Sequence, residues 1–237
     1  MSDLTKRILS VSTYVILLLF VISSNIFSQE YQWSIYNIKV DRVNVNQVVS
    51  ILDGYLSNSD NLAEGVTVSL YEIMFANNDV KATHIIAFSG SPDAMNSQYA
   101  TVQTDEWHLM MSRLGQLTEN DGSAAGRSIH TINSEVEGPI HHIVMLDVDE
   151  PSKKADAFKK MWTTVKPTSR ITLGQVVSGR QNGGSHYVLV TNKDFKDLVS
   201  PRDWSAKEEA AWAKYLADGG ATEVVSTQTR ALVKQWK

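Results

Sequence analysis

The feature that most constrains the fold is a repeated order of predicted elements, strand–helix–strand–strand–helix–strand in each half of the chain. Alternating apolar and polar residues predict the strands, and apolar residues at helical spacing predict the helices. The first unit has strands at 33–41, 66–76, 83–88 and 126–132 and helices at 43–56 and 104–117. Between its third strand and second helix, Gly90 and Pro92 predict a loop.

The second half follows the same order. It has strands at 140–148, 170–179, 186–191 and 223–233, a helix at 151–165, and a helix ending near Ala217 that Asp203 or Ser205 can cap. A polar linker near 133–138 separates the halves, so we expect units at 29–133 and 139–237. Aligning them matches three residue pairs: His84 with His186, Trp107 with Trp212, and Arg127 with Arg230.

A βαββαβ unit forms a four-stranded antiparallel sheet with both helices on one face. The strand at 83–88 is apolar on both faces, with Ile86 and Phe88 on one side and Ile85 and Ala87 on the other. Two such sheets in one chain can cover each other's free face. We therefore predict an α+β fold, two ferredoxin-like units packed sheet to sheet as a single-chain barrel.

This pattern resembles the dimeric α+β barrel superfamily, over about residues 33–236. That superfamily includes cofactor-free monooxygenases of the antibiotic-biosynthesis type, stress-responsive barrel proteins and haem-binding members. The resemblance implies a fused tandem of two units and allows haem as a cofactor. It rests on the order of elements, because the sequence has no diagnostic family motif.

The N-terminus predicts export. Lys6 and Arg7 precede an apolar run over 8–22, which is shorter than the roughly 20 residues that span a bilayer comfortably. Residues 1–28 are therefore expected to be a signal peptide, with Ser28 as the candidate cleavage point, or else an uncleaved membrane anchor. Either form would deliver the body to the periplasm or outside the cell.

Composition excludes several classes of site. The chain has no cysteine, which excludes disulfides, thiolate nucleophiles and a lipoprotein anchor. Its formal charge of −4, without a basic run, argues against nucleic acid as a partner. No HExxH, phosphate-binding or GxSxG motif is present. We expect no metal centre in the chain.

His84 and His186 are the candidate catalytic residues, since both begin the third strand of their unit with the same parity. The alternative is a strand-start histidine that hydrogen-bonds to a loop. Tyr187 projects to the face opposite His186 and is not expected in the same site. Only one of His141 and His142 can face a given site, because adjacent strand residues point to opposite faces.

Candidate ligand-binding residues are Arg127 and Arg230, Trp107 and Trp212, and His142. The arginines could hold a carboxylate or be solvated strand-end charges. The tryptophans, with Trp162, could line an aromatic pocket or be ordinary core.

Two functions follow as hypotheses. The first is an exported barrel that binds a small apolar or aromatic molecule or acts as an interaction module, as a monomer or weak homo-oligomer. The alternative is a monooxygenase-type enzyme, either cofactor-free or haem-dependent. A purely structural partner protein is a third interpretation.

Overall fold

The computed structural model describes residues 31–77, 80–100, 104–180 and 183–237. The predicted signal segment at 1–28 lies outside the described residues. Among those described, no helix is both long and apolar enough to span a bilayer.

The first unit contains the predicted six elements and one additional α-helix. Its elements are β1 (Gln32–Val40), α2 (Val45–Leu56), β2 (Thr67–Ala76), β3 (His84–Gly90), α3 (Pro92–Ala100), α4 (Asp105–Gly115) and β4 (Thr118–Ile132), with 3-10 turns at Arg42–Asn44 and Ser59–Asn61.

The second unit repeats this order. Its elements are β5 (Ile140–Val148), α5 (Pro151–Val165), β6 (Arg170–Ser178), β7 (His186–Asn192), α6 (Phe195–Val199), α7 (Ala206–Asp218) and β8 (Thr222–Trp236). Ser205 forms a capping box with Glu208 at the start of α7, so of the two predicted caps the chain uses Ser205.

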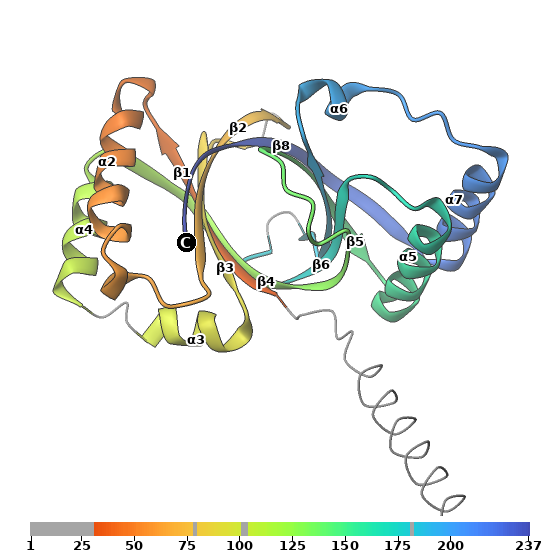
Figure 1. Ribbon diagram of the computed structural model, residues 1–237, viewed down its shortest axis with the longest axis horizontal. Coiled ribbons are helices and arrows are strands. Elements are labelled where there is room, and N and C mark those ends of the chain that lie inside the picture. The colour runs from red at the N-terminus through yellow and green to blue at the C-terminus, as the bar shows by residue number, and fades with distance from the viewer. Residues whose placement is uncertain (1–30, 78–79, 101–103, 181–182) are drawn as a thin grey trace, which may run out of the picture.

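The eight strands form one closed antiparallel barrel in the order β1-β3-β2-β8-β5-β7-β6-β4. The predicted α+β barrel of two ferredoxin-like units is confirmed. The long last strands join the units: β8 pairs with β5 of its own unit and then with β2 of the other. β4 likewise pairs with β1 and then with β6. Figure 1 looks along the barrel, with the helices of each unit on opposite sides.

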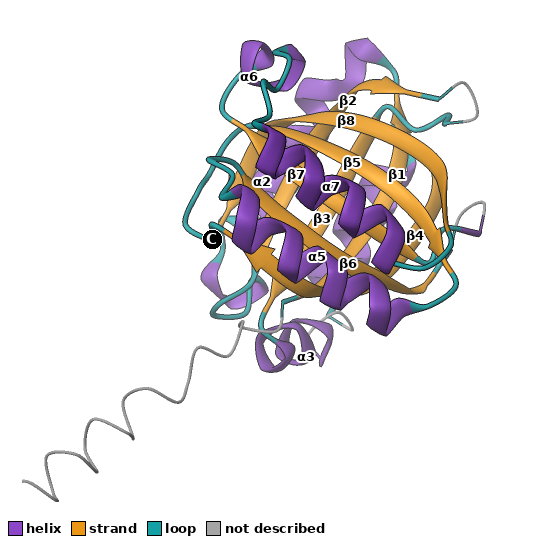
Figure 2. Cartoon of the chain, turned by 90° about the vertical axis from the view of Figure 1, so that its right-hand side faces the viewer, coloured by secondary structure: helices purple, strands orange, loops and turns teal. Residues whose placement is uncertain are grey.

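Each unit buries its own core between helices and strands. Ile86 and Phe88 of β3 belong to the cluster under α2, α3 and α4, while Ala87 faces the barrel interior. In the second unit α5 and α7 lie side by side over the strands (Figure 2). Phe158 and Trp162 of α5 are buried in the core of this unit. The side chains on the outward face of the strands therefore pack against the helices, and those on the inward face line a cavity.

Two parts of the first unit differ from the prediction. The predicted loop at Gly90 and Pro92 contains α3, whose first turn is capped by the Ser91 hydroxyl, which accepts from the Ala94 N–H at 3.2 Å. β4 begins at Thr118 rather than at 126, since its first residues pair with β1 although they are polar and exposed. Hydrophobic alternation could not identify a strand of this composition.

Candidate functional site

A cavity of about 880 Å³ fills the barrel, and inward-facing residues of all eight strands line it. This volume is within the range of roughly 300–1,000 Å³ typical of small-molecule sites. The linker residues 136–139 and Lys237 border one end, and Asn77, Val80 and Asp121 border the other. At the first end the Lys237 ammonium lies 3.6 Å from the Glu137 carboxylate.

Polar residues cross the cavity wall in one row. Arg170 of β6 pairs with Thr191 of β7, Thr191 pairs with His141 of β5, and His141 pairs with Arg230 of β8. All four line the cavity. Residues directly opposite on neighbouring strands have Cβ atoms about 5 Å apart, so this register brings long side chains together.

The two arginines of this row have no compensating charge. Arg230 is 7% exposed, and its guanidinium carbon lies 4.1 Å from the centroid of the Tyr71 ring. Its Nε, like the Nε of Arg170, is buried without a hydrogen-bond partner. No carboxylate in the described part of the chain forms an ion pair with either arginine. Since unpaired buried charge is costly, this arrangement favours an anionic ligand.

His141 lies in the field of both guanidinium groups. Burial, then the charges of Arg230 and Arg170, lowers its pKa to about 3, against a weaker opposing hydrogen bond with the Gly138 backbone. Its ring centroid is 5.0 Å from that of Tyr71, and its Nδ1 has no partner. The imidazole is therefore neutral at physiological pH and can accept a proton or a hydrogen bond from a ligand.

Trp33 and Tyr187 form the aromatic part of the cavity wall. Their rings meet edge to face with centroids 5.4 Å apart. A Cβ at Gly126 would lie 2.5 Å from the Trp33 ring, and one at Gly174 would lie 2.1 Å from the Tyr187 ring. Burial raises the pKa of Tyr187 to about 12, so its hydroxyl keeps its proton. The two glycines give the rings room to lie against the strands.

Comparison with known proteins adds a fold but no sequence relative. No family profile and no curated protein sequence matches the chain. A protein of Lactobacillus acidophilus NCFM assigned as a monooxygenase is similar over 87% of this chain and 96% of its own, at 8% identity and a TM-score of 0.60. An anthrone oxidase-like protein matches over 88% and 93%, at 11% identity and a TM-score of 0.53. A mutant chlorite dismutase of Candidatus Nitrospira defluvii matches over 86% and 92%, at 10% identity and a TM-score of 0.52.

The chain has the dimeric α+β barrel fold. Both halves of this barrel are in one polypeptide, so each structural neighbour is matched across the two units together. At such low identity the likeness extends to the fold, and the site has to be argued from the residues of this chain.

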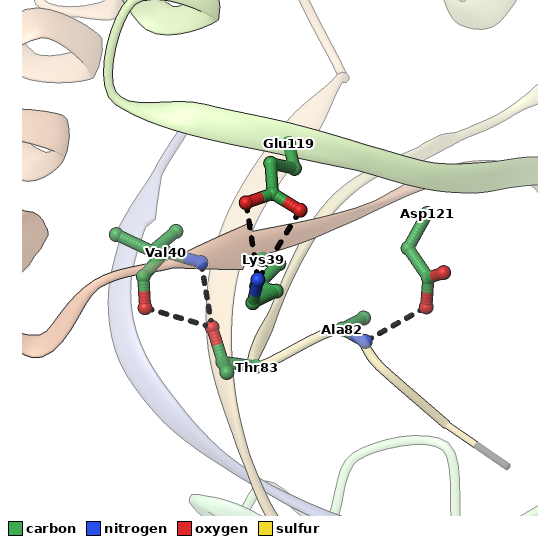
Figure 3. A network of polar contacts seen from close by, with 6 residues as sticks. All are labelled: Lys39, Val40, Ala82, Thr83, Glu119 and Asp121. Carbon is green, nitrogen blue, oxygen red and sulfur yellow. Dashed lines mark hydrogen bonds and ion pairs between the residues drawn. The ribbon is translucent and has the colours of Figure 1, made fainter.

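His84 and His186 lie on the outside of the α+β barrel, facing the helices. Both are buried, at 5% and 1% exposure. His84 Nδ1 lies 3.0 Å from the hydroxyl of Thr83, which also accepts from the Val40 N–H at 2.9 Å (Figure 3). Ser185 repeats the arrangement, 2.9 Å from His186 Nδ1 and accepting from the Val148 N–H at 3.0 Å.

Two further polar contacts lie near the start of β3. The Asp121 carboxylate accepts from the Ala82 N–H at 2.7 Å, and Lys39 pairs with Glu119 at 3.0 Å (Figure 3). These contacts join β4 to β1 and to the segment that precedes β3. The surroundings of His84 and His186 are those of the alternative interpretation, a histidine that begins a strand and hydrogen-bonds to the residue before it.

The two predicted arginines occupy non-equivalent positions. Ile38 pairs with His84 as Leu146 pairs with His186, so Trp33 occupies the position in β1 that His141 occupies in β5. Arg230 pairs with His141, whereas Gly126 pairs with Trp33. Arg127 is one residue further along, exposed, and donates from Nε to Gln175 Oε1 at 3.2 Å. A one-residue shift reverses the face of a strand residue, so only Arg230 lines the cavity.

The other predicted residues lie outside the cavity. Trp107 packs on Tyr55 and Phe88 in the first core, and Trp212 is 38% exposed beside Trp204. His142 Nδ1 lies 3.0 Å from Thr229 Oγ1 on the outer face.

Sequence reasoning missed Arg170, Tyr71, Tyr187 and Trp33, and left His141 undistinguished from His142. The signal available for them is strand parity. Each lies on the face opposite the residues that pack under the helices.

Proposed function

We propose that this α+β barrel is a monooxygenase-type enzyme that binds an acidic organic molecule as its anion inside the barrel. The main observation is that Arg170 and Arg230 line one cavity and, among the described residues, neither forms an ion pair with a carboxylate. The structural neighbours, among them an assigned monooxygenase and an anthrone oxidase-like protein, support oxidation as the reaction type.

Anthrone is a suitable test substrate because it is a carbon acid that forms an enolate. A bound anion would offset the charges of Arg170 and Arg230 that lower the His141 pKa. His141 could then take the proton from the substrate C–H at its unpartnered Nδ1. The guanidinium groups would stabilise the enolate oxygen as charge develops.

The oxidation that follows balances with molecular oxygen alone. The enolate carbon bonds to O₂, and the protonated imidazole returns its proton to the peroxide. Loss of the second C–H proton breaks the O–O bond, leaving one oxygen atom as the new carbonyl and the other as water. Anthrone and O₂ thus give anthraquinone and water, with four electrons passing from substrate to oxygen.

Haem, which the fold resemblance allows, does not fit the residues present. His84 and His186 face packed helices and do not line the cavity. His141 does face the cavity, but the charges of two guanidinium groups oppose a metal cation beside it. A Soret band in protein from haem-supplemented cells would contradict this assignment.

A binding protein without catalysis is the second candidate function, favoured by the same uncompensated charges. Measuring turnover as well as binding separates the two. Export through residues 1–28 stays a prediction, and cell fractionation with N-terminal sequencing of the mature protein would test it.

The decisive experiment compares 2-naphthoate with its uncharged methyl ester by calorimetry, using the full chain. We expect R230M to weaken naphthoate binding roughly 10- to 100-fold, since hydrogen bonds to charged groups contribute about 1.5–3 kcal/mol. Binding of the ester should change less than twofold. Arg113, exposed on α4, provides the matched control R113M.

Oxygen uptake with anthrone tests the reaction. Uptake above the buffer rate should occur with wild type and R113M and fall at least tenfold in R230M. If the protein binds naphthoate but causes no oxygen uptake with anthrone, the result would favour a binding protein without catalysis. Equal affinity for acid and ester would reject the proposed site.

A further inference from the structure

The cavity wall carries two positive charges that no other charged side chain of the wall pairs with. The charged residues among its lining are Arg170, Arg230, Lys237, Glu137 and Asp121. Lys237 and Glu137 pair with each other at the linker end, 3.6 Å apart. The Asp121 carboxylate borders the opposite end, where it accepts from the Ala82 N–H at 2.7 Å. Arg170 and Arg230 are thus the charges of the wall that a ligand would have to meet.

Both guanidinium charges act on the same part of the interior. Burial, then the charges of Arg230 and Arg170, lowers the pKa of His141. At Tyr187 burial raises the pKa, and the same two charges oppose that effect. His141 and Tyr187 belong to β5 and β7, which are neighbouring strands. A ligand placed beside these two side chains would therefore feel both positive charges.

The two guanidinium groups are nevertheless held on separate strands. Arg170 is on β6 and Arg230 on β8, with β7 and β5 between them. Neighbouring strands are about 4.8 Å apart, so the two backbones are separated by roughly 14 Å along the wall. The Arg230 guanidinium also lies 4.1 Å from the ring centroid of Tyr71, a residue of β2, which follows β8 on the side away from β6. Two separate anionic groups match this arrangement better than one.

A ligand with a single negative charge would leave one arginine without a partner. The Nε of Arg170 and the Nε of Arg230 are both buried and unpartnered. An uncompensated buried charge is costly, and a carboxylate can accept two parallel N–H bonds from a guanidinium. A second carboxylate on the ligand would therefore add a charge-assisted contact of its own.

We infer that the barrel selects organic acids with two carboxylates, one held by Arg170 and the other by Arg230, over acids with one. This inference rests on the proposed anion site and names the class of acid that the site prefers. The carbon chain between the carboxylates would pass Thr191 and His141, which lie between the arginines in the register. A C–H bond of that chain would then lie beside the imidazole that is proposed to take the proton.

The experiment measures, by calorimetry on the full chain, the affinity for straight-chain dicarboxylates of four to eight carbons, from succinate to suberate. The monocarboxylate of equal chain length is measured beside each one. At one or more lengths wild type should bind the dicarboxylate at least about tenfold more tightly, because only the dicarboxylate reaches both guanidinium groups. Dicarboxylates too short to span the two arginines should gain less than about threefold.

Substitution of Arg170 tests which residue gives the preference. In R170M the best dicarboxylate should bind at least tenfold more weakly than in wild type, whereas monocarboxylate affinity should stay within threefold because Arg230 remains. R170K keeps the charge and should keep at least a threefold preference for the dicarboxylate. R113M, the exposed control on α4, should match wild type for both kinds of acid.

The outcomes separate this inference from the proposed function. If wild type binds neither these acids nor 2-naphthoate, the anion site itself is wrong. If naphthoate binds but no dicarboxylate is preferred over its monocarboxylate, the anion site stands and the two-carboxylate inference is overturned. A full preference in R170M would overturn the role of Arg170. Tighter binding of methyl phosphate than of any dicarboxylate would place both charges on one group and would also overturn the inference.

Discussion

At the scale of single residues, Arg230 is a buried charge whose position in the cavity wall lowers the stability of the folded protein. Its guanidinium is buried and contacts the Tyr71 ring, but it has no carboxylate partner in the described chain. A residue that is unfavourable in the empty protein and favourable with an anion bound is typical of a binding site.

We therefore predict that R230M does not destabilise the ligand-free protein. Replacing even a buried ion pair by apolar side chains of similar size is often neutral or stabilising by about 1–4 kcal/mol, and a buried charge without a partner is more costly than a paired one. The melting temperature should be equal to or above that of wild type. With saturating 2-naphthoate the order should reverse, because only wild type gains binding energy. A clearly lower melting temperature for ligand-free R230M would contradict the prediction.

His141 gives the stability a dependence on pH. The folded protein keeps this imidazole neutral down to about pH 3, whereas its ordinary pKa is 6.5. The unfolded chain then binds the extra proton, so stability falls as pH drops from 6.5 toward 3, by at most about 1.4 kcal/mol per pH unit. Urea unfolding at several pH values should show a shallower acid slope for H141Q.

The comparison with H141Q removes the contribution of other histidines. Burial also lowers the pKa of His84, His130, His142 and His186, but these contribute equally to wild type and variant. Identical slopes would show that His141 titrates normally in the folded protein.

Little of the candidate site could be predicted from sequence. Of the predicted site residues, only Arg230 lines the cavity. The alignment matched it with Arg127, although the strand register matches it with Gly126, which pairs with Trp33 as Arg230 pairs with His141. His84 and His186 do occupy equivalent positions in the two units. What repeats there is a contact between a hydroxyl and a histidine at the start of the third strand, outside the cavity.

At the scale of elements, those hydroxyl–histidine pairs anchor the third strand of each unit. We predict that S185A lowers the free energy of unfolding by about 1–3 kcal/mol, since it leaves the buried Val148 N–H without its acceptor. Naphthoate affinity should stay within twofold, because the pair lies outside the cavity. T163A, on the exposed face of α5, is the matched control and should change stability by less than about 0.5 kcal/mol.

The order of elements was predictable because α2, α4, α5, α7 and most strands carry a clear apolar face. Of the elements that the pattern missed, α3 and the beginning of β4 are polar, and α6 has only five residues. α6 is a single short turn capped by Asp194, whose carboxylate accepts from the Asp197 N–H at 2.8 Å. Caps, rather than apolar spacing, were the available signal for the two helices.

At the scale of the whole molecule, the barrel has no free strand edge among its eight strands. Residues 31–133 alone would expose β2 and β4, which normally pair with β8 and β6. We predict that this fragment self-associates or aggregates, since unpaired edges template further pairing. Light scattering should show a species larger than a monomer, and adding residues 134–237 should restore a one-to-one complex. A stable monomeric fragment would contradict this.

The linker across 133–139 has a consequence for how such a cavity can evolve. In a barrel assembled from two copies of one chain, each mutation appears on both walls at once, so an arginine gained on one wall is also gained on the other. Here the two walls are encoded separately, and selection can change one while keeping the other. That freedom permits Arg230 to stand where its counterpart is Gly126. Because both units are encoded in one chain, the two halves of the cavity wall can differ permanently. A molecule bound in the barrel then meets different side chains on its two sides.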